Sequence, residues 1–240
     1  MLSLIELIKQ SHPFWGYRRV WATLRKYHGL KVNRKRIARL MRKNGFSVHR
    51  PTLKAKRAPG RAKMKPHATN QCWGTDMTKV CTARGWVYIV LFVDWFSKKI
   101  VGFNAGYQSL SRDWLEALDM GLNKNFPSGV RGSGLHLVSD NGCQPTSKTY
   151  RQECDRLGIM QIFTSYNNPK GNADTERMIR TAKEELFWLH EWESLEQLKW
   201  HLTAWVEDYN NNYLHSALGY KTPNEVHEQQ PGKNSPLIAA

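Results

Sequence analysis

Hydrophobic residues in the first fifty positions recur every three to four residues, which is the spacing of amphipathic helices. The first series consists of Tyr17, Val20, Trp21, Leu24 and Tyr27. Gly29 follows it, and a glycine just past the last helical residue commonly ends a helix. The second series, which follows the favoured N-cap residue type Asn33, consists of Ile37, Leu40 and Met41. Two short helices joined by a tight turn are the pattern of a helix-turn-helix module.

From residue 71 onward the pattern becomes that of a mixed α/β domain. Alternating or continuous apolar runs predict strands at 73–80, 86–94, 99–105, 135–139 and 159–163. Helical spacing predicts helices at 111–123, 147–157, 174–192 and 194–209. The order βββαβαβα, with short gaps between the first three strands, predicts an α/β sandwich rather than a doubly wound sheet. The tryptophans expected to fill the space between the last two helices and the sheet are Trp188, Trp192, Trp200 and Trp205.

Positive charge is concentrated at one end of the chain. The 240 residues include 36 Lys and Arg against 20 Asp and Glu, a net charge of +16. Residues 1–70 hold 19 of these cations and a single acid, Glu6, whereas residues 71–240 hold 17 cations and 19 acids. A basic segment with helical periodicity predicts a polyanion-binding module rather than a solubilising tail. We therefore expect a helix-turn-helix DNA-binding domain at 1–50, a basic linker at 51–70 and a separate domain at 71–240.

The cations of the basic module are expected to contact DNA phosphates, with only a few of them reading base edges. The candidates are Arg18, Arg19, Arg34, Lys35, Arg36 and Arg39. The alternative is a small helical hairpin whose cations merely face water. The charge asymmetry between the two parts of the chain favours the DNA-binding module over this alternative.

Composition and cysteine usage exclude several classes of protein. The longest apolar run, residues 86–93, is far shorter than the ~18 residues of a membrane span. The apolar segment at the N-terminus is too short and too acidic for a secretory signal. The four cysteines form no CxxC pair, which argues against a disulfide framework or a zinc site and favours a reducing cytoplasm.

Three acidic residues stand where they can meet at one edge of the predicted sheet. Asp76 lies inside the first strand, Asp140 follows the fourth strand, and Glu176 lies in the first turn of a late helix. Carboxylates brought together repel one another, so such a cluster normally indicates a bound cation, and all-oxygen ligation favours Mg²⁺ or Mn²⁺. Each acid also has a purely structural interpretation. Asp76 could pair with a buried cation, Asp140 could be a turn residue, and Glu176 could be a favourable charge at a helix N-terminus.

The helix that begins near residue 174 is expected to carry cations beside its acid. One stripe of this helix consists of Glu176, Arg180, Lys183 and Phe187. Another stripe, expected to pack on the sheet, consists of Met178, Ala182, Leu186 and Leu189. The candidate DNA contacts on and before this helix are Lys183, Arg180, Arg177 and Lys170. The alternative for Arg180 is an ion pair with Glu184 one turn later, and Asp94 is a weaker candidate for the acidic site.

These residues form a set of motifs with characteristic spacing. The basic module contains Phe14-Trp-Gly-Tyr-Arg-Arg19, and the first predicted strand contains Trp73-x-x-Asp76-x-Thr78. The fourth predicted strand leads into Ser139-Asp140-Asn-Gly142. Thirty-five residues separate Asp140 from Glu176, and Lys183 lies seven residues beyond Glu176. Near the end stand Tyr209-Asn210, His215-Ser-Ala-Leu218 and Thr222-Pro223. Over about residues 12–226 the chain resembles the transposases of bacterial insertion sequences, the long-frame catalytic subunits of the retroviral-integrase or DDE superfamily.

The resemblance implies a ribonuclease-H-like catalytic core preceded by the helix-turn-helix module, in a bacterial cytoplasm. It implies an enzyme that cleaves the ends of an insertion element and joins the 3′-hydroxyl ends to target DNA. Asp76, Asp140 and Glu176 would then hold two Mg²⁺ or Mn²⁺ ions about 4 Å apart around the scissile phosphodiester. The implied partners are double-stranded DNA, as terminal repeats and as target, and further copies of the chain.

The sequence departs from the family pattern at two places. Tyr213 stands where the family usually has an arginine, and the chain starts close to the helix-turn-helix. The short N-terminal part leaves open whether an upstream companion reading frame supplies further segments. Two alternative functions share some of these features: a ribonuclease-H-like or Holliday-junction nuclease that only hydrolyses, and a DNA-binding repressor derived from a defunct transposase.

Overall fold

The computed structural model describes residues 1–48, 64–164 and 171–229, and its N-terminal part is a three-helix module. The helices are α1 (Leu2–Ser11), α2 (Tyr17–Lys26) and α3 (Arg34–Lys43). The buried apolar residues that join them are Ile5, Ile8, Val20, Leu24, Ile37 and Met41. As predicted, Asn33 caps α3, because its Oδ1 accepts a hydrogen bond from the Lys35 backbone N–H at 2.8 Å. Most of the predicted linker falls on residues outside the described ranges.

A five-stranded mixed sheet forms the centre of the second part of the chain. The strands are β1 (Cys72–Thr82), β2 (Gly85–Asp94), β3 (Ile100–Gly106), β4 (His136–Ser139) and β5 (Met160–Phe163). Their spatial order is β3-β2-β1-β4-β5. The first three strands form the predicted antiparallel meander, and β4 and β5 add parallel to β1. The predicted fold class, an α/β core behind a small helical module, is confirmed.

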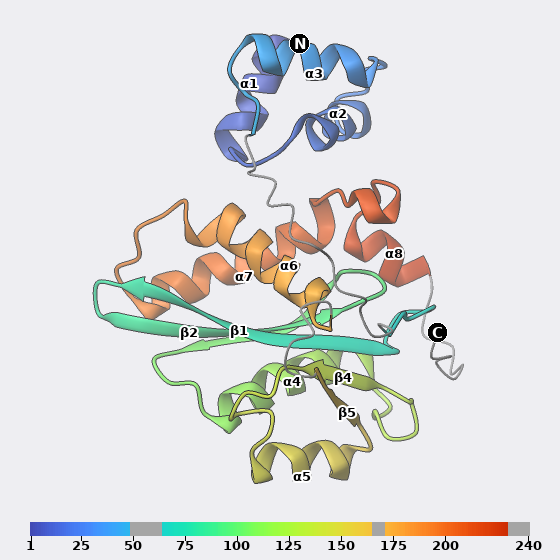
Figure 1. The fold of residues 1–240 in the computed structure, drawn as a ribbon, viewed down its shortest axis with the longest axis vertical. Helices are drawn as coiled ribbons and strands as arrows, with labels where there is room; N and C mark the ends of the chain where they lie inside the picture. The colour runs from blue at the N-terminus through green and yellow to red at the C-terminus, as the bar shows by residue number, and fades with distance from the viewer. Residues whose placement is uncertain (49–63, 165–170, 230–240) are drawn as a thin grey trace, which may run out of the picture.

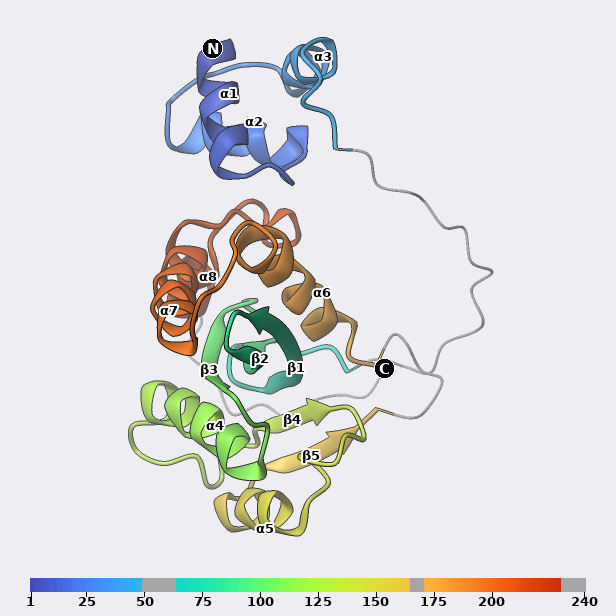
Figure 2. The same ribbon diagram turned by 90° about the vertical axis from the view of Figure 1, so that its left-hand side faces the viewer.

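Helices cover both faces of the sheet, as Figures 1 and 2 show. One layer consists of α4 (Ser111–Asn125) and α5 (Lys148–Leu157). The other consists of α6 (Ala173–Ala182), the π-helical turn η1 (Lys183–Phe187), α7 (Leu195–Asn212) and α8 (Pro223–Gln229). Successive side chains of β2 point to opposite faces of the sheet and so belong to different cores. Ile89 and Leu91 belong to the core under α6 and α7, whereas Val90 and Phe92 belong to the core over α4.

Three details differ from the sequence-based expectation. Helix α1 was not predicted, although its buried Ile5 and Ile8 have helical spacing. The helix predicted to run to residue 192 widens at Lys183 into the π-helical turn and ends at Phe187. The expectation that four tryptophans fill the helix–sheet interface is wrong for two of them, since Trp188 and Trp200 are 60% and 70% exposed. Trp192 is buried as expected.

The helical module packs on the layer of α6, α7 and α8 (Figure 1). The centre of this interface is Glu185 of η1, whose side chain is only 4% exposed. Its carboxylate accepts a hydrogen bond from Trp15 Nε1 at 2.8 Å and lies 2.9 Å from His12 Nδ1. At the other end of the interface, Lys26 of α2 pairs with Glu225 of α8 at 2.6 Å. The basic module is therefore attached to the same continuous helix that carries the third predicted acid.

Candidate active site

Asp76 and Asp140 lie at corresponding positions of two neighbouring parallel strands. The pairing of β1 with β4 ends with Gly74 opposite Val138, and each aspartate follows two residues later in its chain. Side chains two residues apart share a face of a sheet, and neighbouring strands are about 4.8 Å apart. Both carboxylates therefore belong to the face on which Gly74 lies. The sequence placed Asp76 in mid-strand and Asp140 just after a strand, and the structure agrees.

The start of α6 packs on that same face at a point where β1 has no side chain. A Cβ atom added at Gly74 would lie 2.0 Å from Thr175 Oγ1 and 2.1 Å from Trp95 Nε1. These two buried side chains are hydrogen-bonded to each other at 3.0 Å over the glycine. Only glycine leaves this space, so the close approach of α6 to β1 depends on Gly74.

The first turn of α6 brings Glu176 to the two aspartates. Asn172, the buried residue before α6, donates a hydrogen bond from Nδ2 to the Thr75 carbonyl oxygen at 3.2 Å. This bond fixes the start of α6 beside the residue that precedes Asp76. Glu176 is exposed and lies one turn after Asn172, whose carbonyl accepts its backbone N–H at 3.0 Å. The helix N-terminus also favours negative charge at this position.

The electrostatics of Asp76 show that the three acids are close enough to interact. The pKa of Asp76 is raised to about 6, mainly by burial and also by the charges of Asp140 and Glu176. The hydrogen bond from the Met77 backbone N–H and the charge of Lys183 act in the opposite direction on this pKa. Residues 76, 140, 176 and 183 therefore form one electrostatic unit, in which negative charge exceeds positive charge.

Asp140 is held by the turn that follows β4. Its Oδ1 accepts a hydrogen bond from the Gly142 backbone N–H at 3.0 Å, which is the Asx-turn geometry. Asn141 donates from Nδ2 to the Thr164 carbonyl oxygen at 2.6 Å and ties the turn to the end of β5. The Ser139-Asp140-Asn-Gly142 sequence therefore builds a fixed turn that leaves the Asp140 side chain exposed.

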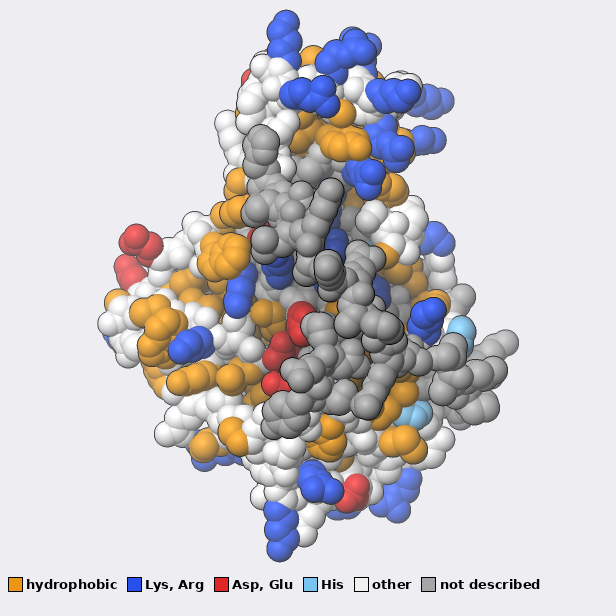
Figure 3. Space-filling view, in the orientation of Figure 1, with side chains coloured by type: hydrophobic (Ala, Val, Ile, Leu, Met, Phe, Trp, Pro, Cys, Tyr) orange, Lys and Arg blue, Asp and Glu red, His pale blue; other side chains and the backbone are white. Residues whose placement is uncertain are grey.

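The donor set fits a hard divalent cation. The three carboxylates supply oxygen ligands only, and Asp76 carries an uncompensated burial cost that a cation would relieve. Among the residues that the structure describes, no three His, Cys, Asp or Glu side chains stand at the mutual distances of an assembled metal cage. Like charges repel at close range, so such carboxylates gather fully only around an ion. Figure 3 shows acidic side chains in the middle of this face, below a group of Lys and Arg side chains.

The predicted cations of α6 have different surroundings. Lys183 is half-buried and acts on the charge of Asp76. Arg180 pairs with Glu184 at 2.8 Å, which is the alternative considered from the sequence. Arg177 is exposed, and Lys170 lies outside the described residues. The assignment of these residues to DNA stays a prediction.

The predicted cations of the helical module also divide into two groups. Those exposed to solvent are Arg18, Arg34, Lys35, Arg36 and Arg39. Arg19 instead lies inside the interface with the core, where its guanidinium stacks on the Tyr213 ring at 4.0 Å and its Nε donates to the Leu214 carbonyl oxygen at 3.3 Å. Tyr213, the position where the family usually has an arginine, thus contacts the module.

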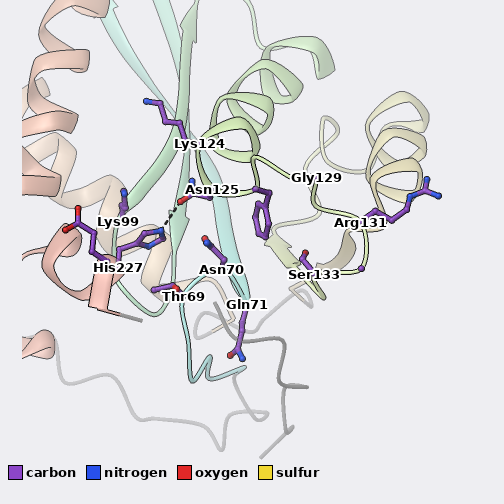
Figure 4. A pocket seen from close by; sticks show the side chains of 13 residues that line it. Thr69, Asn70, Gln71, Lys99, Lys124, Asn125, Gly129, Arg131, Ser133 and His227 are labelled. Carbon is purple, nitrogen blue, oxygen red and sulfur yellow. Dashed lines mark hydrogen bonds between the residues drawn. The ribbon is translucent and has the colours of Figure 1, made fainter. Parts of the chain in front are cut away.

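Asp94 belongs to a separate hydrogen-bond network. Its buried carboxylate accepts hydrogen bonds from the backbone N–H groups of Asn70 and Ser97, both at 2.7 Å. The network continues from Ser97 to His227 at 3.1 Å and from His227 to Asn125 at 2.8 Å, the contact drawn in Figure 4. Burial lowers the pKa of His227 to about 4. This network holds α8 beside a cavity of about 580 Å³ at the start of β1.

The residues that position the acids were largely missed in the sequence. No positioning role was predicted for Thr175, Trp95 or Asn172. A signal was present, since Gly74 breaks an otherwise bulky strand, and glycine within a strand often marks the close approach of another backbone.

Known protein families match both parts of the chain. Residues 2–52 match the HTH-like domain, and residues 66–169 and 157–223 match two integrase core domain families. The transposase for insertion sequence element IS629 of Shigella sonnei is 29% identical over 90% of this chain and 75% of its own length. The transposase for insertion sequence element IS904 of Lactococcus lactis is 27% identical over 82% of this chain and 81% of its own length.

Solved integrases share the fold. A chain of the simian T-cell lymphotropic virus intasome, solved in complex with PP2A regulatory subunit B56 gamma, superposes with a TM-score of 0.61 and 17% identity, over 99% of this chain and 78% of its own. The HTLV-2 integrase catalytic core, solved with magnesium, superposes with a TM-score of 0.52 and 15% identity, over 68% of this chain and 99% of its own.

Fold and motifs together define a ribonuclease-H-like polynucleotidyl transferase core with a helix-turn-helix module. The HTH-like and integrase core domain matches and the similarity to curated transposases support an insertion-sequence transposase of the DDE/integrase superfamily, a family that acts in DNA transposition and integration. None of the helices that the structure describes is both long and apolar enough to cross a membrane.

Proposed function

We propose that this protein cleaves the ends of an insertion element and joins the resulting 3′-hydroxyl ends to target DNA at a single site. The observation that carries the proposal is the convergence of Asp76, Asp140 and Glu176 on one face of the sheet, where the pKa of Asp76 is raised by burial and by the other two acids. Three acids with only Lys183 to compensate their charge are costly in a folded protein, and this arrangement suits a site for divalent cations.

In this proposal the three acids would hold two Mg²⁺ or Mn²⁺ ions, which would supply charge stabilisation for the phosphoryl transfer. The magnesium in the related HTLV-2 core supports this choice of metal. Asp76 is fixed by its strand, Asp140 by its turn and Glu176 by the packing of α6 on Gly74, so the protein supplies preorganised ligands. Lys183 adds positive charge beside them, for a DNA phosphate.

The helical module supplies affinity for DNA. The exposed cations of α3 are suited to phosphate contacts, and Asn33 fixes the start of this helix. The proposed partners are element terminal repeats, target DNA and a second copy of the chain, because two element ends are processed together. A labelled element-end duplex incubated with the chain, Mg²⁺ and a target plasmid tests the proposal, and joined product is the expected result.

The test has a matched pair of variants. Asp140→Asn removes one proposed ligand at constant size, and we expect it to lower cutting and joining at least 100-fold while leaving end binding unchanged. Asp119→Asn makes the same chemical change on the exposed side of α4 and should leave all three measurements unaltered. Cutting without joining by the natural chain would identify a hydrolytic nuclease, and binding alone a repressor. Full activity of Asp140→Asn would remove Asp140 from the site.

A further inference from the structure

The turn that joins β2 to β3 contacts the start of α6 at two places. The first contact is the hydrogen bond from Trp95 Nε1 to Thr175 Oγ1 at 3.0 Å. The second is an ion pair at 3.3 Å between Lys98 Nζ and Asp174 Oδ1. Asp174, Thr175 and Glu176 are consecutive residues in the first turn of α6. The β2–β3 turn therefore holds the two residues that directly precede the third acid of the site.

The β2–β3 turn is itself fixed by hydrogen bonds. The carboxylate of Asp94 accepts hydrogen bonds from the backbone N–H and the hydroxyl of Ser97, at 2.7 and 2.8 Å. The Lys98 carbonyl oxygen accepts a hydrogen bond from the Tyr209 hydroxyl at 3.0 Å, which ties the turn to α7. Lys98 Nζ also donates to the Trp95 carbonyl oxygen, so the side chain is folded over the turn. The amino group of Lys98 is therefore presented to α6 from a fixed support.

Lys98 has a backbone conformation that suits glycine better than lysine. Its φ is 64°, in the left-handed region that residues with a Cβ atom seldom adopt. Strained residues of this kind cluster at functional sites, where the surrounding contacts hold them in place. The lysine side chain is what distinguishes this position from a glycine turn, and outside the turn it contacts Asp174.

The start of α6 depends on such contacts because its N-cap residue serves another purpose. Asn172 donates its side chain to the Thr75 carbonyl oxygen, and among the described residues it makes no side-chain capping hydrogen bond to the helix. Helix ends fray, and successive helical residues point about 100° apart around the axis. A contact at Thr175 alone fixes the distance from β1, whereas a second contact at Asp174 also fixes the rotation of the first turn. The direction of Glu176 follows from that rotation.

We propose that Lys98 is a positioning residue for the metal site. By holding Asp174, it fixes the rotation of the first turn of α6 and thereby directs Glu176 toward the two aspartates. The same ion pair neutralises a fourth acid that lies only two residues from Glu176. The inference rests on the proposed function and adds to it a residue from the opposite end of β2, outside the three acids.

Four full-length proteins test this inference: the natural chain, Lys98→Met, Lys98→Arg and Lys99→Met. Lys98→Met removes the charge at nearly constant length. Lys99→Met makes the same change at the next residue, which is half-buried and lines the cavity at the start of β1. The first measurement is hydrogen exchange, without metal, of the Glu176 backbone amide that is bonded to the Asn172 carbonyl oxygen. We expect this exchange to be at least tenfold faster in Lys98→Met and unchanged in Lys99→Met.

The second measurement is the binding of Mn²⁺ to the chain without DNA. Lys98→Met should need at least a fivefold higher Mn²⁺ concentration for half-saturation, because one of the ligands is no longer held in place. Cutting at saturating DNA should fall at least tenfold, while end binding should equal that of Lys99→Met. Lys98→Arg should recover most of each loss, because it keeps the positive charge that pairs with Asp174.

The comparison of the variants decides the inference. Unchanged exchange at Glu176 in Lys98→Met overturns it, and so does faster exchange with unaltered Mn²⁺ affinity and cutting. Equal effects of Lys98→Met and Lys99→Met would also overturn it, because a general loss of positive charge would then be the cause. A natural chain that neither binds Mn²⁺ nor cuts DNA would overturn the proposed function and this inference with it. A natural chain that cuts DNA no better than Lys98→Met would overturn the inference alone.

Discussion

Two buried aspartates of the core show how environment separates a structural acid from a functional one. Asp94 is fully buried, and its carboxylate is satisfied by two backbone N–H groups and the Ser97 hydroxyl. Asp76 accepts one backbone N–H, from Met77, and faces two further acids. Asp94 therefore has the complete hydrogen bonding expected of a buried carboxylate, whereas Asp76 carries a burial cost that the Met77 N–H and the charge of Lys183 offset only in part.

Replacing Asp76 by asparagine should therefore stabilise the metal-free protein at neutral pH. The pKa of Asp76 is about 6 in the folded chain and near 3.8 when unfolded, so the unfolded state releases its proton more readily. Stability is then lost as the pH rises from about 4 to about 6, and Asp76→Asn should recover about 3 kcal/mol above pH 6 but nothing below pH 4. Urea unfolding at pH 4 and pH 7.5 measures the difference.

Magnesium provides the control for this prediction. Mg²⁺ should raise the unfolding temperature of the natural chain at pH 7.5 and have little effect on Asp76→Asn, because the variant lacks one charged ligand. A variant that is less stable than the natural chain at pH 7.5 would show that Asp76 has a structural partner. The same shift by Mg²⁺ in both proteins would contradict the placement of metal at Asp76.

At the scale of elements, the sequence predicted those helices and strands that have a clear hydrophobic periodicity. The order of the five strands, the helices predicted between them and the N-cap at Asn33 follow from local patterns and are confirmed, whereas α1 and α8 were not predicted. The π-helical turn at Lys183–Phe187 has no periodic signature, so the helix was extended beyond its real end. The exposed Trp188 and Trp200 were expected in the core because apolar character alone does not reveal which face of a helix meets the sheet.

Helix α6 depends on Gly74 for its position on β1, which gives a prediction at this scale. Gly74→Ala would place a Cβ atom 2.0 Å from Thr175 Oγ1, so α6 has to move away from the strand. Overpacking of this kind costs about 1–3 kcal/mol, and a displaced Glu176 should lower DNA cutting far more than end binding. Gly106→Ala is the control within the same sheet, because its nearest contact would be an ordinary 3.5 Å.

Denaturant unfolding and cutting assays on both glycine variants check this prediction. Equal stability and activity of Gly74→Ala and Gly106→Ala would mean that α6 tolerates the added methyl group. In that case, the position of Glu176 would have to be fixed by contacts other than those over Gly74.

At the scale of the whole molecule, the structure gives the Phe14-Trp-Gly-Tyr-Arg-Arg19 segment two roles. The sequence suggested a DNA-binding motif, and Arg18 is exposed in agreement with it. Trp15 and Arg19, however, face the core and contact Glu185 and Tyr213. Such docking was beyond sequence reasoning, because it joins residues 170 positions apart and the periodicity of α2 does not distinguish its own core from an interface. The described contacts make the module and the helix of Glu176 one unit.

This coupling predicts that Glu185 transmits the position of bound DNA to the active site. Glu185→Ala removes the acceptor of the Trp15 indole N–H and should cost about 1–3 kcal/mol of stability, because Trp15 and His12 lose their buried partner. The α3 cations are untouched, so end binding should change less than threefold while cutting at saturating DNA falls at least tenfold. Glu193→Ala, an exposed acid beyond the interface, is the control.

A double-mutant cycle with Trp15→Phe separates coupling from general damage. Trp15 stacks on His12 at 3.8 Å, and phenylalanine retains a smaller aromatic ring there but has no N–H, so both variants remove the same hydrogen bond. Their combined loss of stability should fall short of the sum of the single losses by about 1 kcal/mol. Strict additivity would show that Trp15 and Glu185 act independently. A cutting rate of Glu185→Ala equal to that of Glu193→Ala would show that the module only binds DNA, and that its attachment to η1 has no influence on the acids.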